Sequence, residues 1–102
     1  MQINQQVYFS IVPEWLTESK VTDNAFRVYA TLCRYADKED GSCYPSIKSI
    51  GNRCGKSPSS VKRALKELKE IGAIKVEARY IDDGQTSNLY TVIFNPTIYG
   101  MG

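Results

Sequence analysis

Apolar residues first recur at helical spacing in the segment after Thr22 and Asp23, either of which can cap a helix. The pattern continues to about Ala36 and predicts one helix over that range. A helix that is apolar on two sides is either central in the fold or part of an interface. The two faces here are Phe26, Tyr29, Ala30 and Cys33 on one side and Val28, Leu32 and Tyr35 on the other.

A second helix follows a polar loop over residues 37–42 and a very short strand at Cys43 and Tyr44. Ser46 is its expected cap, and Gly55 can end it because glycine readily adopts the positive φ of a helix end. Gly51 inside the helix permits close packing. The apolar face of this helix consists of Ile47, Ile50 and Cys54.

The third helix has the strongest boundary signals. Ser57 is its cap, Pro58 occupies the first helical position and Gly72 ends it. One face is polar, with Ser59, Lys62, Arg63 and Lys66, and the opposite face is apolar, with Val61, Ala64, Leu65, Leu68 and Ile71.

After Gly72 the spacing of apolar residues changes to two, which is typical of a strand. Asp83-Gly84 indicates a hairpin, and residues 89–94 form the expected return strand. At the other end of the chain, residues 7–16 are expected to be an extended arm that enters one turn, with Trp15 and Leu16 packed on the domain. We expect a single domain over residues 1–102, with residues 1–12 as the arm and residues 95–102 as a tail or the start of a linker.

This order of elements predicts an α+β fold, a winged helix-turn-helix with a three-helix core and a C-terminal β-hairpin wing. Two helices joined by a short turn that contains glycine describe a helix-turn-helix. The second helix of such a pair enters the major groove of DNA, and its N-terminal residues contact base edges.

The distribution of charge agrees with this interpretation. The net charge is only +2, but residues 46–69 hold seven basic residues against the single acid Glu67, a net charge of +6, which leaves −4 for the rest of the chain. One basic face on a mildly acidic body is typical of a nucleic-acid-binding protein.

Other kinds of site have little support in the sequence. The chain has no histidine, which removes the commonest general base and metal ligand. Cys33, Cys43 and Cys54 form no C-x-x-C pair and are expected to be buried thiols. We therefore expect no catalytic residues, no metal, no cofactor and no small-molecule substrate. No apolar run is long enough for a membrane span and the N-terminus has no secretory signal, so the cytoplasm is the expected location.

Several short motifs carry a resemblance to a known family. They are Tyr44-Pro45-Ser46, Gly55-Lys56-Ser57, Val61-Lys62-Arg63, residues 68–74 and Asn88-Leu89-Tyr90. With this pattern, the chain resembles the winged helix-turn-helix domain of plasmid and phage replication initiators, and also DnaD-like primosomal domains, from about Val12 to Ile93. Gly51 and Cys54 depart from the pattern, where leucine or alanine is usual, and this departure bears on the rigidity of the second helix.

The expected DNA contacts divide into three groups. Lys62 and Arg63 are candidates for guanine, because their donors match its N7 and O6 acceptors. We expect the DNA backbone phosphates to be contacted by Lys48, Arg53 and Lys56. We expect an adjacent minor groove to be contacted by Arg79 and by the wing tip near Gln85. The full set of expected DNA-binding residues is Ser46, Lys48, Arg53, Lys56, Ser57, Ser59, Ser60, Lys62, Arg63, Lys66, Arg79, Gln85 and Thr86.

These residues predict sequence-specific binding of double-stranded DNA, and the resemblance implies origin recognition by the N-terminal domain of a replication initiator. Two alternatives stay open: a stand-alone transcriptional regulator of MarR-like type, and a protein–protein adaptor on the same scaffold. A homodimer is a further expectation, with Val28, Leu32 and Tyr35 as its interface.

Overall fold

The structure, a computed structural model, describes residues 13, 16, 20–82 and 84–93. The predicted arm, Trp15, Asp83 and the predicted tail are outside the described residues, so the expectations for them stay predictions. The described elements are the helices α2 (Asp23–Tyr35), α3 (Ile47–Cys54) and α4 (Pro58–Glu70) and the strands β1 (Ser42–Cys43), β2 (Ile74–Glu77), β3 (Tyr80–Ile81), β4 (Gly84–Gln85) and β5 (Leu89–Val92).

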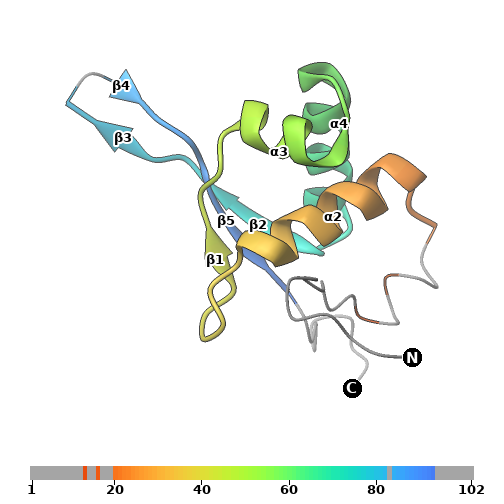
Figure 1. Cartoon of the computed structure of the whole chain (residues 1–102). Coiled ribbons are helices and arrows are strands. Elements are labelled where there is room, and N and C mark those ends of the chain that lie inside the picture. Colours follow the sequence, from red (N-terminus) through yellow and green to blue (C-terminus); the bar gives the residue numbers. More distant parts are fainter. Residues whose placement is uncertain (1–12, 14–15, 17–19, 83, 94–102) are drawn as a thin grey trace, which may run out of the picture.

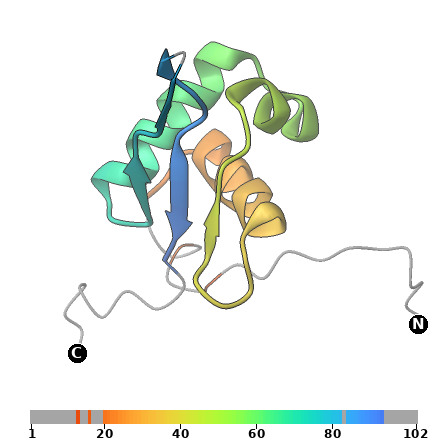
Figure 2. The same ribbon diagram turned by 90° about the vertical axis from the view of Figure 1, so that its left-hand side faces the viewer.

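Three strands form one antiparallel sheet in the order β1-β5-β2, which lies against the helices (Figure 2). The pair β3 and β4 continues the hairpin of β2 and β5 and projects away from the helices (Figure 1). The chain is thus an α+β winged helix, with three helices in its core and a β-hairpin wing. The sheet adds a third strand, β1, to the expected hairpin.

Each helix begins at a hydroxyl side chain that caps it. The hydroxyl groups of Thr22, Ser46 and Ser57 accept hydrogen bonds from the N–H groups of the residues three positions later. Such bonds satisfy backbone donors that a helix start otherwise leaves without partners. The boundaries of all three helices therefore agree with the sequence prediction to within two residues, and α3 is continuous despite Gly51 and Cys54.

The hydrophobic core lies between the three helices α2, α3 and α4 and the inner face of the sheet. The residues that form it are Leu16, Ala25, Val28, Tyr29, Leu32, Cys43, Ile50, Cys54, Val61, Ala64, Leu65, Leu68, Ala73, Ile74, Tyr90 and Val92. The Tyr29 hydroxyl donates to the Ile93 carbonyl at 3.0 Å, which links α2 to the end of β5. The prediction that Leu16 packs on the domain is confirmed, because none of its surface is exposed.

The two stripes predicted for α2 are not separate surfaces. Val28 and Leu32, expected at a dimer interface, have no exposed surface in the single chain and belong to the core. That part of the prediction is wrong, because α2 is packed on several sides, by α4, α3 and the sheet. Tyr35 is half-exposed and contacts Arg53 instead.

The short strand before α3 starts one residue earlier than predicted. Cys43 pairs with Tyr90 of β5, and Tyr44 lies outside the ladder. Pro45 follows directly and has no N–H to donate, so the ladder cannot continue toward α3. Tyr44 is consequently left on the surface with 61% of its area exposed.

The turn between α3 and α4 depends on a close approach of two backbone segments. The Lys56 N–H donates to the Gly51 carbonyl at 3.0 Å, and Gly55 adopts a φ of 71°. A Cβ atom at Gly51 would lie 2.6 Å from the Lys56 carbonyl oxygen. The predicted role of Gly51 in close packing is thereby confirmed.

Gly51→Ala should therefore destabilise the domain by roughly 1–3 kcal/mol. The obstructing atom is a backbone oxygen that cannot rotate away, so the gain of about 1 kcal/mol in helix propensity does not compensate. Urea denaturation measures the loss. Asn52→Ala is the matched control, an exposed position on the same helix where a change within about 0.5 kcal/mol is expected. Equal stability of the two variants would contradict the proposed contact.

Candidate nucleic-acid interface

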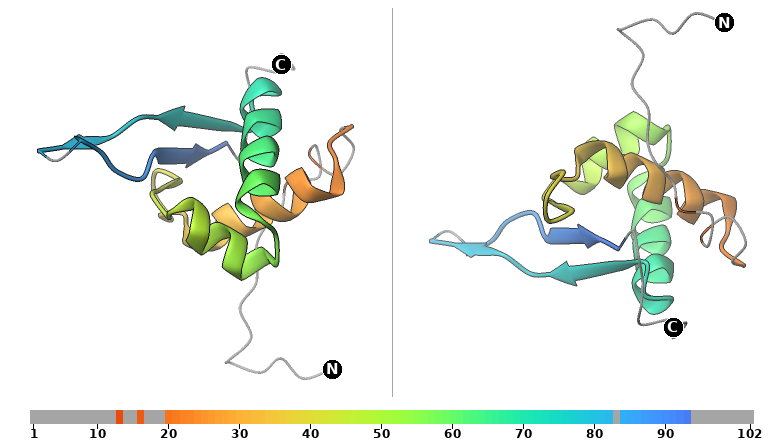
Figure 3. Two further views of the ribbon diagram at one scale, coloured as in Figure 1. Left: turned by 90° about the horizontal axis from the view of Figure 1, so that it is seen from above. Right: turned by 90° about the horizontal axis from the view of Figure 1, so that it is seen from below.

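One long face of α4 is open to solvent. Figure 3 (left) looks onto this helix along its whole length, with α2 crossing beneath it and the wing extending to one side. Val61, Ala64, Leu65 and Leu68 are buried beneath α4, whereas Ser59, Lys62, Arg63 and Lys66 are exposed. The predicted polar face is therefore a free surface of the fold.

Three of the four serines expected at the interface, Ser46, Ser57 and Ser60, have structural partners. The Ser46 hydroxyl accepts from the Ser49 N–H and donates to the Ser49 hydroxyl, both at 3.0 Å. The same arrangement joins Ser57 to Ser60, with distances of 3.2 and 3.1 Å. Ser46 and Ser57 are exposed at helix starts, where positive partial charge favours anions such as phosphate.

Glu67, the single acid of the basic segment, is directed away from the open face of α4. Its two carboxylate oxygens accept hydrogen bonds from the Thr22 N–H and the Thr22 hydroxyl, each at 2.8 Å. The carboxylate therefore lies at the start of α2, a placement that the charge pattern of the sequence did not indicate. This placement suits the positive end of that helix.

The basic residues of α3 and of the turn have different surroundings. Lys48 is exposed and Lys56 is half-buried. The Arg53 guanidinium lies over the Tyr35 ring at 5.5 Å from its centroid, and its Nε donates to the Tyr35 hydroxyl at 3.4 Å. Lys48, Lys56, Lys62, Arg63 and Lys66 form no ion pair with any other described residue.

Of the wing residues expected to contact DNA, Arg79 lies at the wing base. Its Nη1 donates to the Ser87 carbonyl at 3.3 Å, and its guanidinium lies over the Tyr44 ring at 4.4 Å from the centroid. The Gln85 amide donates to Asn88 Oδ1 at 2.8 Å. Thr86 is half-buried, and its N–H donates to the Arg79 carbonyl at 3.0 Å. The wing assignments thus involve groups that already have intramolecular partners.

The end of the wing carries large side chains that are exposed to solvent. Tyr80 is 71% exposed and Ile81 is 58% exposed. Asp82 is exposed beside them, and Asp83 follows in the sequence. The exposed carboxylate of Asp82, beside two side chains without positive charge, repels phosphates rather than attracting them.

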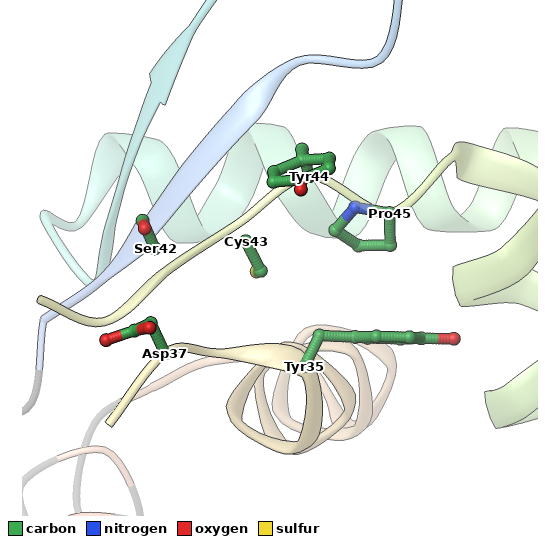
Figure 4. Close-up of a pocket in the computed structure, with 6 residues that line it drawn as sticks. All are labelled: Tyr35, Asp37, Ser42, Cys43, Tyr44 and Pro45. Atoms are coloured by element: carbon green, nitrogen blue, oxygen red, sulfur yellow. The ribbon is translucent and has the colours of Figure 1, made fainter. Parts of the chain in front are cut away.

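Figure 4 shows a surface hollow of about 400 Å³ between the end of α2 and the segment from β1 to α3. Tyr35 and Asp37 line one side, and Ser42, Cys43, Tyr44 and Pro45 line the other. Burial raises the pKa of Cys43 to about 11. Its thiol is accordingly neutral at physiological pH, which is unsuited to nucleophilic attack.

The remaining thiols and the acidic groups do not form a recognisable metal site. Cys33, Cys43 and Cys54 are free, and burial raises the pKa of Cys33 to about 12. Among the described residues, no three His, Cys, Asp or Glu side chains are grouped to hold a metal ion. Over the same residues, no helix has the length and apolar character needed to cross a membrane.

The fold, the tight turn between α3 and α4 and the open face of α4 define the class of the protein, which is a winged helix-turn-helix domain. A family profile described as "Helix-turn-helix domain" matches residues 21–74, which is just over half of the chain. The chain belongs to this family, and this membership supports DNA binding as its biochemical function. No curated protein matches the sequence.

A solved structure gives a second comparison. The chain is similar to a protein described as a possible transcriptional regulator from Methanosarcina mazei Go1, with a TM-score of 0.60 and 16% sequence identity. The similarity covers 78% of this chain and 62% of that protein. At this identity the match establishes the shared fold, and the chain spans less than two thirds of the regulator's length.

The placement of Glu67 leads to a stability prediction. Glu67→Ala should destabilise the domain by roughly 1 kcal/mol, because it removes two charge-assisted hydrogen bonds at the start of α2. Glu70→Ala, at an exposed position of the same helix, is the control and should stay within about 0.5 kcal/mol of the wild type. Thermal unfolding followed by circular dichroism compares the variants. A Glu67→Ala protein as stable as the Glu70→Ala protein would be inconsistent with a stabilising contact.

Proposed function

We propose that this domain binds double-stranded DNA in a sequence-specific manner, with α4 in the major groove. The observation that carries the proposal is the exposed face of α4, where Lys62, Arg63 and Lys66 share a surface from which Glu67 is turned away. A major groove about 12 Å wide accepts a helix presented in this way. The small side chains of Ser57 and Ser59 permit close approach at its N-terminal end.

Within this proposal, affinity and specificity come from different side chains. We assign the neutralisation of phosphates beside the groove to Lys48, Lys56 and Arg53. Arg53 also contacts the Tyr35 hydroxyl in the free protein. Arg63 and Lys62 are proposed to contact base edges, because a guanidinium or ammonium matches the N7 and O6 acceptors of guanine. Lys66, one turn further along α4, extends the basic face.

The biological role has two candidates, each supported by one observation. The motifs from Tyr44 to Tyr90 resemble those of replication initiators and favour origin recognition. The similarity in fold to a possible transcriptional regulator favours control of transcription. Selection from random duplexes, followed by mapping the recovered site in the genome of origin, separates them, because repeated sites at a replication origin support the first and promoter sites the second.

A protein–protein adaptor on this scaffold is less well supported, because an adaptor has no need for a net charge of +6 on residues 46–69. The symmetry of the recovered site also tests for a homodimer. A palindromic site requires two copies, whose interface must lie elsewhere than Val28 and Leu32.

Binding should weaken steeply with salt. Each phosphate contact releases a counterion, so log K should fall against log salt concentration with a slope of about −0.9 per contact. Fluorescence anisotropy titrations with the selected duplex measure this slope. Salt-independent binding, or no binding to any duplex at low salt, would exclude the proposed function.

Arg63→Ala should weaken binding to the preferred duplex by roughly 1–3 kcal/mol and relax the choice at one base position. Lys56→Ala should weaken binding to all duplexes alike, because it removes a phosphate contact. Lys38→Ala is the matched control, since this exposed lysine lies in the loop between α2 and β1, outside the basic segment. Competition with scrambled duplex separates the effects. Identical specificity profiles for the first two variants would refute this division of roles.

A further inference from the structure

The wing is divided into a proximal and a distal part. On one side, Ala78 and Arg79 separate β2 from β3, and on the other side residues 86–88 separate β4 from β5. The distal part is a ladder of two-residue strands, Tyr80 opposite Gln85 and Ile81 opposite Gly84. A ladder this short is only marginally stable in itself, so the direction of the wing depends on contacts made at the break.

Arg79 is the centre of these contacts. Its carbonyl accepts from the Thr86 N–H, and its Nη1 donates to the Ser87 carbonyl, so it joins the two sides of the hairpin at the break. Its guanidinium also lies over the ring of Tyr44, 4.4 Å from the centroid. Arg79 therefore connects the wing to a residue outside it, 35 positions earlier in the sequence.

Tyr44 lies between β1 and the start of α3, so a residue that contacts it is held next to the helix-turn-helix. It follows β1, and only Pro45 separates it from Ser46, the cap of α3. In Figure 4 its ring stands on the side of the hollow opposite Tyr35. No hydrogen bond joins its hydroxyl to another described residue, so the ring makes the contact.

We propose that Tyr44 is a positioning residue for DNA binding, whose ring holds Arg79 and thereby fixes the direction of the wing relative to α3 and α4. This inference rests on the proposed function. A guanidinium over an exposed aromatic ring gives a modest attraction, which is sufficient to select one arrangement of a short hairpin. A wing held in place before binding loses less conformational freedom when DNA is bound, and this increases affinity.

The first test uses the free protein. Hydrogen exchange, measured by NMR, should show faster exchange of the Thr86 N–H in Tyr44→Ala, because the bond from Thr86 to Arg79 lies at the break. Tyr44→Phe keeps the ring and should behave like the wild type. Tyr80→Ala is the control, another exposed tyrosine, on the wing itself, whose ring does not lie under the Arg79 guanidinium. Unchanged exchange in Tyr44→Ala would overturn the proposal.

The second test measures affinity for a duplex obtained by selection, with flanks of one helical turn on each side. Tyr44→Ala and Arg79→Ala should each bind about 3- to 10-fold more weakly, as expected for loss of one cation–π contact. Tyr44→Phe should restore binding. The double variant should be no weaker than Arg79→Ala alone, because Arg79→Ala already removes the contact with Tyr44 together with the bond from Arg79 to the Ser87 carbonyl.

The outcomes of the two tests are separable. Full additivity of Tyr44→Ala and Arg79→Ala, or a loss in Tyr44→Phe as large as in Tyr44→Ala, would overturn the positioning role. If the wild type binds no duplex, the proposed function is wrong, while the exchange of Thr86 still reports whether Tyr44 holds the wing. If Tyr44→Ala does not fold, Tyr44→Leu, which removes the aromatic ring but keeps an apolar side chain, provides the comparison with Tyr44→Phe.

Discussion

The packing of α4 on α2 is the constraint on which the rest of this domain depends. Val61 and Leu68 on one side of α4 are completely buried, and so are Val28 and Leu32 on α2. Since α4 can bury only one side in this way, its opposite side must face outward (Figure 3). The exposed basic face is thus a consequence of the core. The bonds from Thr22 to Glu67 strengthen the same packing and direct this carboxylate toward the start of α2.

The second constraint is the narrow turn that follows α3. The approach of the Lys56 carbonyl to Gly51 holds the end of α3 close to the start of α4. Arg27 of α2 donates to the Cys54 carbonyl at 3.5 Å, which ties the same turn to α2. The relative orientation of α3 and α4 is therefore determined by backbone contacts, which tolerate little change in side-chain size at Gly51.

The sequence predicted the features that depend on local signals. Ser46 and Ser57 as caps, Pro58 at the first helical position and Gly55 at a helix end each act within a few residues, so the helix boundaries could be read from the chain. The alternation after Gly72 predicted the wing for the same reason. Fold class and the outward side of α4 were therefore accessible from the sequence.

The features that the sequence did not predict join distant residues. Thr22 and Glu67 are 45 positions apart, and no local pattern distinguishes Glu67 from the equally acidic Glu70. The burial of Val28 and Leu32 depends on how many elements surround α2, which periodicity alone does not give. The sequence placed Tyr44 in a short strand and in a motif but did not pair it with Arg79, because the two residues are 35 positions apart and meet only in the folded chain.

The contact between Arg79 and Tyr44 also bears on how charge is distributed along the wing. Ile81 and Asp82 are exposed at the tip, whereas the cation of the wing, Arg79, is held at its base against Tyr44. In the proposed complex, contact between the wing and a phosphate is therefore favoured near the base and opposed near Asp82, whose carboxylate would face the negative backbone. In the same proposed complex, the exposed side chains of Tyr80 and Ile81 are better suited to a groove than to the phosphate backbone. The direction of the wing relative to α4 decides whether the distal wing meets a groove or the phosphate backbone. We propose that the stack of Arg79 on Tyr44 determines this direction.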